Sequence, residues 1–159
     1  MKKPLYYLSI LAAIITCSCN SGPKEKSDSS NKARTDTVVS QTCYLSTYEK
    51  DTLILQVDQK ANNMVTGKLK MKFPNKPAND GTIEGKFVGD TLFVDYTFIL
   101  GANKAQTFKN PMAFLLQKKE LTMGIGVIET SYGRSYFAKD KAINFEKSKY
   151  RFKVTDCKK

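Results

Sequence analysis

The chain has 159 residues and carries 26 Lys and Arg against 15 Asp and Glu, a net charge of +11. It contains no histidine, which excludes Ser-His-Asp and Cys-His catalysis and removes the commonest transition-metal ligand. A chain this basic is compatible with nucleic-acid binding, but the export signal described next makes that partner remote. We therefore expect no cofactor, no metal and no nucleic acid.

A basic start and a short apolar run mark the N-terminus. Lys2 and Lys3 precede an apolar run over residues 5–15, which is too short to span a bilayer because a spanning helix needs about 20 residues. A basic flank, a short apolar stretch and small residues at its exit are typical of a cleaved signal peptide. We therefore expect an exported protein, with a buried N-terminal helix as the alternative.

The exit from this run reads "IITCSCNS" and resembles the cleavage site of bacterial lipoproteins, in which a cysteine that follows small residues carries the lipid. Cys19 fits this pattern better than Cys17, because Ser18 precedes it. The resemblance implies a lipoprotein signal peptide over residues 1–18 and an acyl group on Cys19. Such a group would attach the protein to the lipid membrane of the bacterial cell envelope without spanning it.

Residues 19–37 are expected to form a flexible tether, because from residue 20 on they contain no large apolar side chain and cannot bury enough surface to offset the entropy of ordering. Some Bacteroidetes lipoproteins carry an acidic cluster after the lipidated cysteine that directs them to the cell surface. This chain lacks such a cluster, so we expect the periplasmic face of the envelope.

Two cysteines, Cys43 and Cys157, stand near the ends of the remaining chain. In an oxidising compartment they are expected to form one structural disulfide, and the mature part has no CxxC pair that would indicate a metal site. The Cα atoms of a disulfide lie within about 7 Å of each other. The first and last strands of the domain should therefore be neighbours, as in a closed sheet.

From residue 38 onward apolar and polar residues alternate, which is the period of strands with one buried face. The alternating runs are residues 52–57, 65–73, 82–88, 91–100, 120–128 and 149–157. Their predicted buried face holds Leu53, Leu55, Val57, Val65, Leu69, Met71, Phe73, Ile83, Phe87, Leu92, Val94, Tyr96, Phe98, Leu121, Met123, Ile125, Val127, Tyr150, Phe152 and Val154.

Turn residues separate these runs, with the pair Gly89-Asp90 typical of a tight hairpin. Residues 106–117 are predicted to form a further strand, in which Pro111 indicates an edge or a bulge. Helix is limited to one short turn near residues 139–150. The chain therefore predicts an all-β domain over residues 38–159: a single small antiparallel β-barrel or strongly curled meander of about eight to nine strands, closed by one disulfide.

Residues 81–98 read "GTIEGKFVGDTLFVDYTF", and the segments around this stretch are, in chain order, CY, DTL, VTGKL, a Gly-rich strand and a final cysteine. In this stretch and in this order of segments, the chain resembles a set of small lipoproteins of Bacteroidetes without known activity. The resemblance covers nearly all of residues 42–157. It implies an all-β lipoprotein domain and assigns no function.

Three groups of residues are candidates for function. The first is a lysine cluster that could bind an anionic envelope surface, with a solvated face as the alternative: Lys68, Lys70, Lys72 and Lys86. The second is "SYGRSYF", which resembles a Ser-Gly-x-x-Tyr loop of periplasmic lysozyme inhibitors, with a simple turn as the alternative: Tyr132, Gly133, Arg134 and Tyr136. The third is a pair of carboxylates, Glu84 and Asp95, which we expect to pair with lysines and not to act as acid and base.

Two further features bear on function. Gly124 and Gly126 are expected to relieve crowding in a curved strand, with close approach to a ligand as the alternative. Small barrels either fill themselves with side chains or hold one ligand, and the many large inward residues favour a filled interior.

We therefore expect a non-enzymatic binding or interaction module whose partner is an unknown protein or a small apolar ligand. The alternative is an inhibitor of a peptidoglycan hydrolase, and a hydrolase that uses carboxylates alone is a remote third reading.

Overall fold

The computed structural model describes residues 37–157 of the chain. The predicted signal peptide, Cys17 and Cys19, and all but the last residue of the predicted tether lie outside these residues. The regular structure of the described residues is entirely strand, and the predicted all-β fold is confirmed. Within residues 37–157 no helix is long and apolar enough to cross a membrane.

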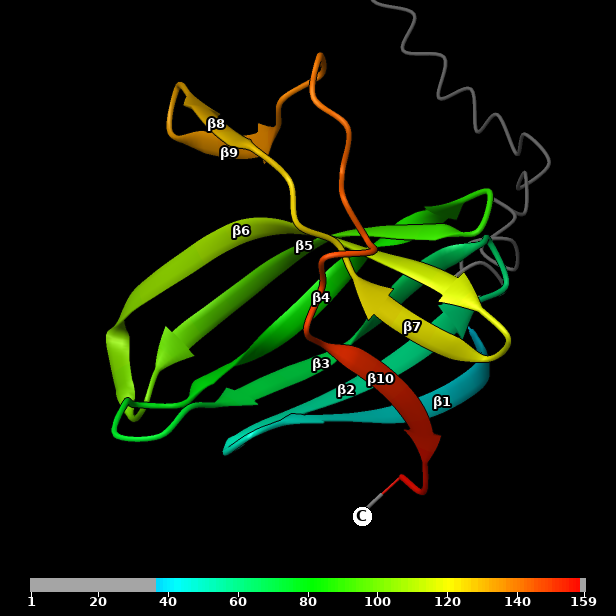
Figure 1. Ribbon diagram of the computed structural model, residues 1–159, viewed down its shortest axis with the longest axis horizontal. Helices are drawn as coiled ribbons and strands as arrows, with labels where there is room; N and C mark the ends of the chain where they lie inside the picture. Colours follow the sequence, from blue (N-terminus) through cyan, green and yellow to red (C-terminus); the bar gives the residue numbers. More distant parts are fainter. Residues whose placement is uncertain (1–36, 158–159) are drawn as a thin grey trace, which may run out of the picture.

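Eight of the ten strands in the described part of the chain form a closed antiparallel barrel in the order β1-β10-β7-β6-β5-β4-β3-β2 (Figure 1). The remaining two, β8 and β9, form a separate hairpin that stands off the barrel wall. The strands are β1 (Val38–Tyr48), β2 (Asp51–Lys60), β3 (Met64–Lys72), β4 (Asn79–Val88), β5 (Thr91–Leu100), β6 (Asn103–Gln117), β7 (Glu120–Met123), β8 (Ile128–Ser131), β9 (Arg134–Phe137) and β10 (Arg151–Thr155).

The barrel closes where the first strand meets the last. Cys43 of β1 lies opposite Thr155 of β10, and Cys43 is bonded to Cys157 with a Cα–Cα distance of 5.2 Å and 114 positions between them in the sequence. The predicted disulfide and the predicted neighbourhood of the first and last strands are confirmed. This seam is short, because β10 pairs with β1 through only three residues and with β7 through two.

The inward side chains of the strands fill the middle of the barrel with one continuous apolar core. Sixteen buried residues make up this core: Tyr44, Leu53, Leu55, Val57, Val65, Leu69, Met71, Ile83, Leu92, Val94, Tyr96, Phe98, Phe114, Leu121, Tyr150 and Phe152. Phe114 and Phe152 meet edge to face with ring centroids 5.6 Å apart. The period of two therefore predicted which side of most strands is buried.

Glycines allow neighbouring strands to coil tightly on one wall. A Cβ added at Gly67 would overlap the carbonyl oxygen of Gln56 on β2, and one added at Gly85 would overlap the carbonyl oxygen of Phe93 on β5. No side chain fits at either place, so the strong curvature of β3 and β4 depends on these two glycines.

One end of the barrel, which we call the mouth, carries the β1–β2, β3–β4 and β5–β6 turns and the segment 124–150 that contains the β8–β9 hairpin. The prediction of a strand over residues 120–128 is wrong for the second half of this range. β7 ends at Met123, and Ile125 and Val127 are about half exposed. The reason is that Ile125 leaves the sheet and forms a bridge with Asn144 instead.

Val154 is also exposed although its spacing predicts burial. It lies in the part of β10 that has only β1 as a neighbour, because β7 reaches no further than Phe152. Alternation gives the face of a side chain but not whether another strand covers it.

The first two thirds of β6 form an edge. β6 pairs with β5 along most of its length but with β7 only from Phe114 to Gln117. Pro111, which has no backbone N–H, lies in the part with one neighbour, so the predicted edge position is confirmed. The opening between this part of β6 and the segment after β7 borders the site described next.

Candidate functional site

A cavity of about 330 Å³ lies at the mouth of the barrel, beside the edge of β6. Its walls come from the ends of β3, β5 and β7, from the middle of β6 and from the segment 124–150. The lining is mostly methionine and aromatic: Met71, Met112, Met123, Phe73, Phe98, Phe137, Tyr96 and Tyr150. The barrel is thus filled in its middle and hollow at one end.

A stack of three rings on β5 and β6 supports one wall of the cavity, and two of these rings, Tyr96 and Phe98, line it. The rings of Tyr96 and Phe98 lie 4.6 Å apart and nearly parallel, and Phe108 continues the stack 5.5 Å from Phe98. Tyr96 is only 2% exposed, and its hydroxyl donates to the carbonyl oxygen of Leu69 at 2.9 Å. Burial, and to a lesser degree the charge of Asp80, raises the pKa of Tyr96 far above its usual value. This wall is therefore uncharged at any physiological pH.

Two amides supply the polar groups of the cavity. Asn79 at the start of β4 and Asn110 on β6 both line it, and neither side chain has a hydrogen-bond partner within residues 37–157. Among residues 37–157 no charged side chain lines the cavity. Such a site favours an uncharged ligand, because an ion would lose its hydration without gaining a counter-charge.

A polar clamp at the rim fixes the side of the cavity that Tyr150 provides. The Tyr150 hydroxyl donates to Asp51 Oδ2 at 2.6 Å, and Lys149 Nζ lies 3.4 Å from the same oxygen. Lys149 Nζ also lies 5.0 Å and 4.9 Å from the ring centroids of Tyr48 and Tyr150. These contacts join the end of segment 124–150 to the β1–β2 turn.

The same clamp shifts three pKa values. The hydrogen bond from Tyr150, helped by Lys149, holds the pKa of the Asp51 carboxyl below its ordinary value. Burial, then the bond to Asp51, raises the pKa of the Tyr150 hydroxyl. The contact with Tyr150 raises the pKa of the Lys149 ammonium. Around neutral pH the clamp therefore consists of a carboxylate, a neutral phenol and an ammonium group.

Gly124 and Gly126 also line the cavity. A Cβ at Gly126 would lie 2.6 Å from Phe137 Cδ1, and one at Gly124 would overlap Ile143 Cγ2. Both glycines thus make room for side chains, as predicted, but they do so after the end of β7 and not within a curved strand.

The predicted lysine cluster is only partly brought together. Lys68, Lys70 and Lys72 form a row on the outer face of β3, and Lys70 pairs with Asp80 at 2.7 Å. Lys86 lies opposite Met64, whereas Lys68 lies opposite Thr82, so Lys86 is about 13 Å further along the sheet. The lysines face the outside of the barrel and do not contribute to the cavity at its mouth.

The predicted loop lies at the tip of the β8–β9 hairpin. Tyr132 and Gly133 form its two-residue turn with φ of 48° and 73°, so the interpretation as a turn is confirmed. Tyr132 is fully exposed, whereas Tyr136 turns back toward the outer face of β5 and β6, where it lines a hollow with Phe93. Arg134 follows the turn directly and begins β9.

The two carboxylates behave differently. Asp95 pairs with Lys109 at 2.8 Å, as expected. Glu84 lies directly opposite Asp95 and makes no ion pair within residues 37–157, so its predicted lysine partner is wrong. The cause is the register, which places a like charge beside it. Among the described residues no group of three or more Cys, Asp or Glu could hold a metal ion.

Sequence reasoning missed most of the cavity. Phe137, Asn79 and Asn110 lie in three different elements, and only the packing of segment 124–150 over the mouth brings them together. The Gly-x-Gly spacing at 124–126 was the one local sign that the strand stops there.

Comparison with known proteins finds no match, whether among protein-family models, curated proteins or solved structures.

Proposed function

We propose that the domain is a non-enzymatic binding module that holds one small, uncharged, apolar ligand at the mouth of its barrel. The observation that supports this most is the cavity of about 330 Å³ lined by methionine and aromatic side chains. Its volume falls at the lower end of the range of about 300–1,000 Å³ that small-molecule sites occupy. Methionine adapts to irregular apolar shapes and makes favourable contacts with aromatic rings, so the lining suits a planar or chain-like molecule.

The expected affinity is modest. A ligand that buries about 250 Å² of apolar surface gains roughly 6 kcal/mol, and lost translational and rotational freedom offsets at least about 4 kcal/mol of this gain. A dissociation constant on the order of 10 mM follows from apolar burial alone. Hydrogen bonds to Asn79 and Asn110 would orient the ligand and tighten binding further.

A titration with an uncharged fluorescent aromatic probe tests this proposal. Asn110→Phe places a ring in the cavity and should weaken probe binding at least tenfold. Gln106→Phe is the matched control, because Gln106 is exposed on the same strand but does not line the cavity, and it should leave binding unchanged. Equal binding by both variants, or tighter binding of an anionic probe of the same size, would refute the proposal.

We further propose that the domain is a lipoprotein of the bacterial cell envelope, anchored through Cys19 and facing the periplasm. The sequence pattern at residues 1–19 supports this placement. Radiolabelled palmitate should be incorporated by the natural chain and by Cys17→Ala but not by Cys19→Ala. Labelling of Cys19→Ala would contradict the assignment of the acylated residue.

A second candidate function, inhibition of a peptidoglycan hydrolase, is favoured by the fully exposed Tyr132 at the tip of a projecting hairpin. Such a tip could enter the substrate cleft of an enzyme. The test is lysozyme activity with increasing amounts of the protein, with Tyr132→Ala beside it. Inhibition of lysozyme by the natural chain but not by Tyr132→Ala would support this function. Unchanged lysozyme activity in the presence of the natural chain would exclude it for that enzyme.

A further inference from the structure

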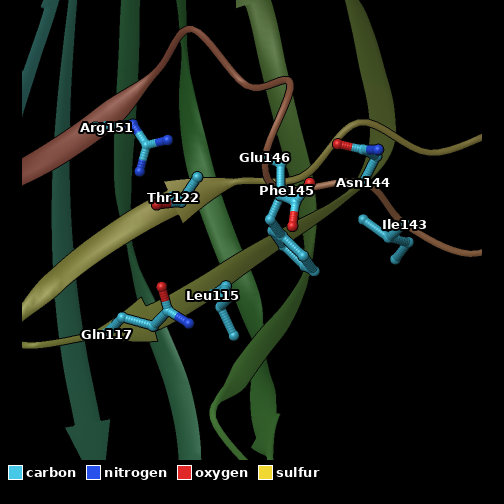
Figure 2. A pocket seen from close by; sticks show the side chains of 8 residues that line it. All are labelled: Leu115, Gln117, Thr122, Ile143, Asn144, Phe145, Glu146 and Arg151. Carbon is cyan, nitrogen blue, oxygen red and sulfur yellow. The ribbon is translucent and has the colours of Figure 1, made fainter.

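A second hollow, of about 530 Å³, lies on the outer face of the barrel where β6, β7 and β10 run side by side (Figure 2). Leu115, Thr122 and Arg151 lie opposite one another in register across the three strands and form its floor. The segment 143–146 forms its wall. We call this hollow the outer groove, and it is distinct from the cavity at the mouth.

The wall of the outer groove is held in place by hydrogen bonds. Ile125 and Asn144 exchange two backbone hydrogen bonds of 2.8 Å, and Asn144 Oδ1 accepts a third from the backbone N–H of Lys147 at 2.9 Å. Ile143 and Phe145 pack against the space left by Gly124. A wall fixed in this way reduces the ordering cost of binding.

A threonine hydroxyl lies on the floor of the outer groove. Thr122 is only 6% exposed, and its side chain makes no hydrogen bond within residues 37–157. Among these residues the buried side-chain oxygen or nitrogen without a partner is Ser46 Oγ, so the Thr122 hydroxyl is open to the groove that Thr122 lines. It is therefore free to bond to a ligand bound there.

Two opposite charges flank this hydroxyl without pairing. Figure 2 shows Thr122 between Arg151 on one side and Glu146 on the other. Neither charged side chain forms an ion pair or a side-chain hydrogen bond within the described part of the chain, and the amide of Gln117, which also lines the groove, is likewise without a partner there. A cation and an anion kept apart beside polar groups match a ligand with the opposite arrangement of charges.

We propose that the outer groove binds a short peptide with both termini free, its carboxylate on Arg151 and its ammonium group on Glu146. The arginine guanidinium suits this role because it can donate two parallel hydrogen bonds to one carboxylate. Thr122 lies between the charges and Gln117 lies two positions beyond Leu115 along β6, and their hydroxyl and amide can bond to the N–H and C=O groups of a peptide bond. A single amino acid has only its two charges and offers no such group.

The test is an isothermal or NMR titration of the full chain with the dipeptide Ala-Ala, with a dissociation constant on the order of 1 mM expected for so small a ligand. N-acetylated and C-amidated Ala-Ala and free alanine should each bind at least tenfold more weakly. These blocked ligands test the proposal without any change to the protein.

Variants test the assignment of residues. Arg151→Gln, Glu146→Gln and Thr122→Val should each weaken Ala-Ala binding at least fivefold, whereas Arg134→Gln and Glu129→Gln, on the β8–β9 hairpin, should not. The proposal fails if Ala-Ala shows no saturable binding at about 20 mM, well above the expected constant. It also fails if a blocked form or free alanine binds as tightly, or if Arg151→Gln binds as well as Arg134→Gln.

Discussion

Removal of the Cys43–Cys157 disulfide should greatly destabilise the barrel. The bond joins residues 114 positions apart, so its loss releases nearly the whole domain from one closed loop. In the chain-entropy model a loop of 100 residues is worth about 4.7 kcal/mol, and measured values are often smaller. A loss of about 2–5 kcal/mol in the free energy of unfolding follows, out of the 5–15 kcal/mol typical of a folded domain.

The loss of stability should be greatest at the seam between β1, β10 and β7. Without the bond, β10 is held to β1 through three paired residues and to β7 through two. The strands on the opposite wall pair over most of their length. The rate of backbone amide hydrogen exchange should therefore increase most at Tyr44, Leu45 and Lys153, which lie at the seam.

The assay is urea unfolding of the oxidised protein, of the protein in reductant, and of the double variant Cys43→Ala/Cys157→Ser. Far-UV circular dichroism or tyrosine fluorescence reports it, because the chain has no tryptophan. With a slope of about 1–3 kcal/mol per molar urea, the urea midpoint should fall by at least about 0.7 M both in reductant and in the double variant. A fall of less than about 0.3 M in either form would refute the reasoning.

Three further predictions concern single side chains. Ser46→Ala should raise the free energy of unfolding by about 1 kcal/mol, because the Ser46 hydroxyl is 1% exposed and has no hydrogen-bond partner within residues 37–157; a loss of stability in urea would contradict this. Gly67→Ala should destabilise the domain by about 2 kcal/mol or more, since its methyl group would overlap the backbone of β2; an unchanged midpoint would show that the strands can separate freely. Tyr150→Phe should raise the pKa of Asp51 toward its ordinary value in an NMR pH titration. The depressed pKa of Asp51 contributes stability that is complete above about pH 4 and is lost as the pH falls through the folded-state pKa. The free energy of unfolding of Tyr150→Phe should therefore fall less between neutral and acid pH than that of the natural chain. An equal fall in both proteins would contradict the contribution of the Tyr150–Asp51 hydrogen bond.

Alternation and turn chemistry predicted most of the barrel. Leu69, Met71 and Phe98 were assigned correctly because each strand has one buried face, and Pro111 marked the edge because it cannot donate a hydrogen bond. The disulfide predicted the closure because its geometry requires its two ends to be adjacent.

The segment 124–150 could not be predicted in the same way. Its path depends on single contacts, such as the bridge from Ile125 to Asn144 and the packing of Phe137 against Gly126. Such contacts have no period in the sequence, so Ile125 was wrongly assigned to a buried strand. Both candidate sites depend on this segment, and for that reason neither could be located from the sequence.

Whether the mouth cavity holds a ligand can be measured on molecules from the protein's own host. Native mass spectrometry of the protein equilibrated with a concentrated apolar extract of its host should show one added mass per chain, from an uncharged apolar molecule that the uncharged aromatic probe displaces. Asn110→Phe treated in the same way should lack this mass. No added mass, an added mass from a charged molecule, or equal binding by Asn110→Phe would contradict ligand binding at the mouth.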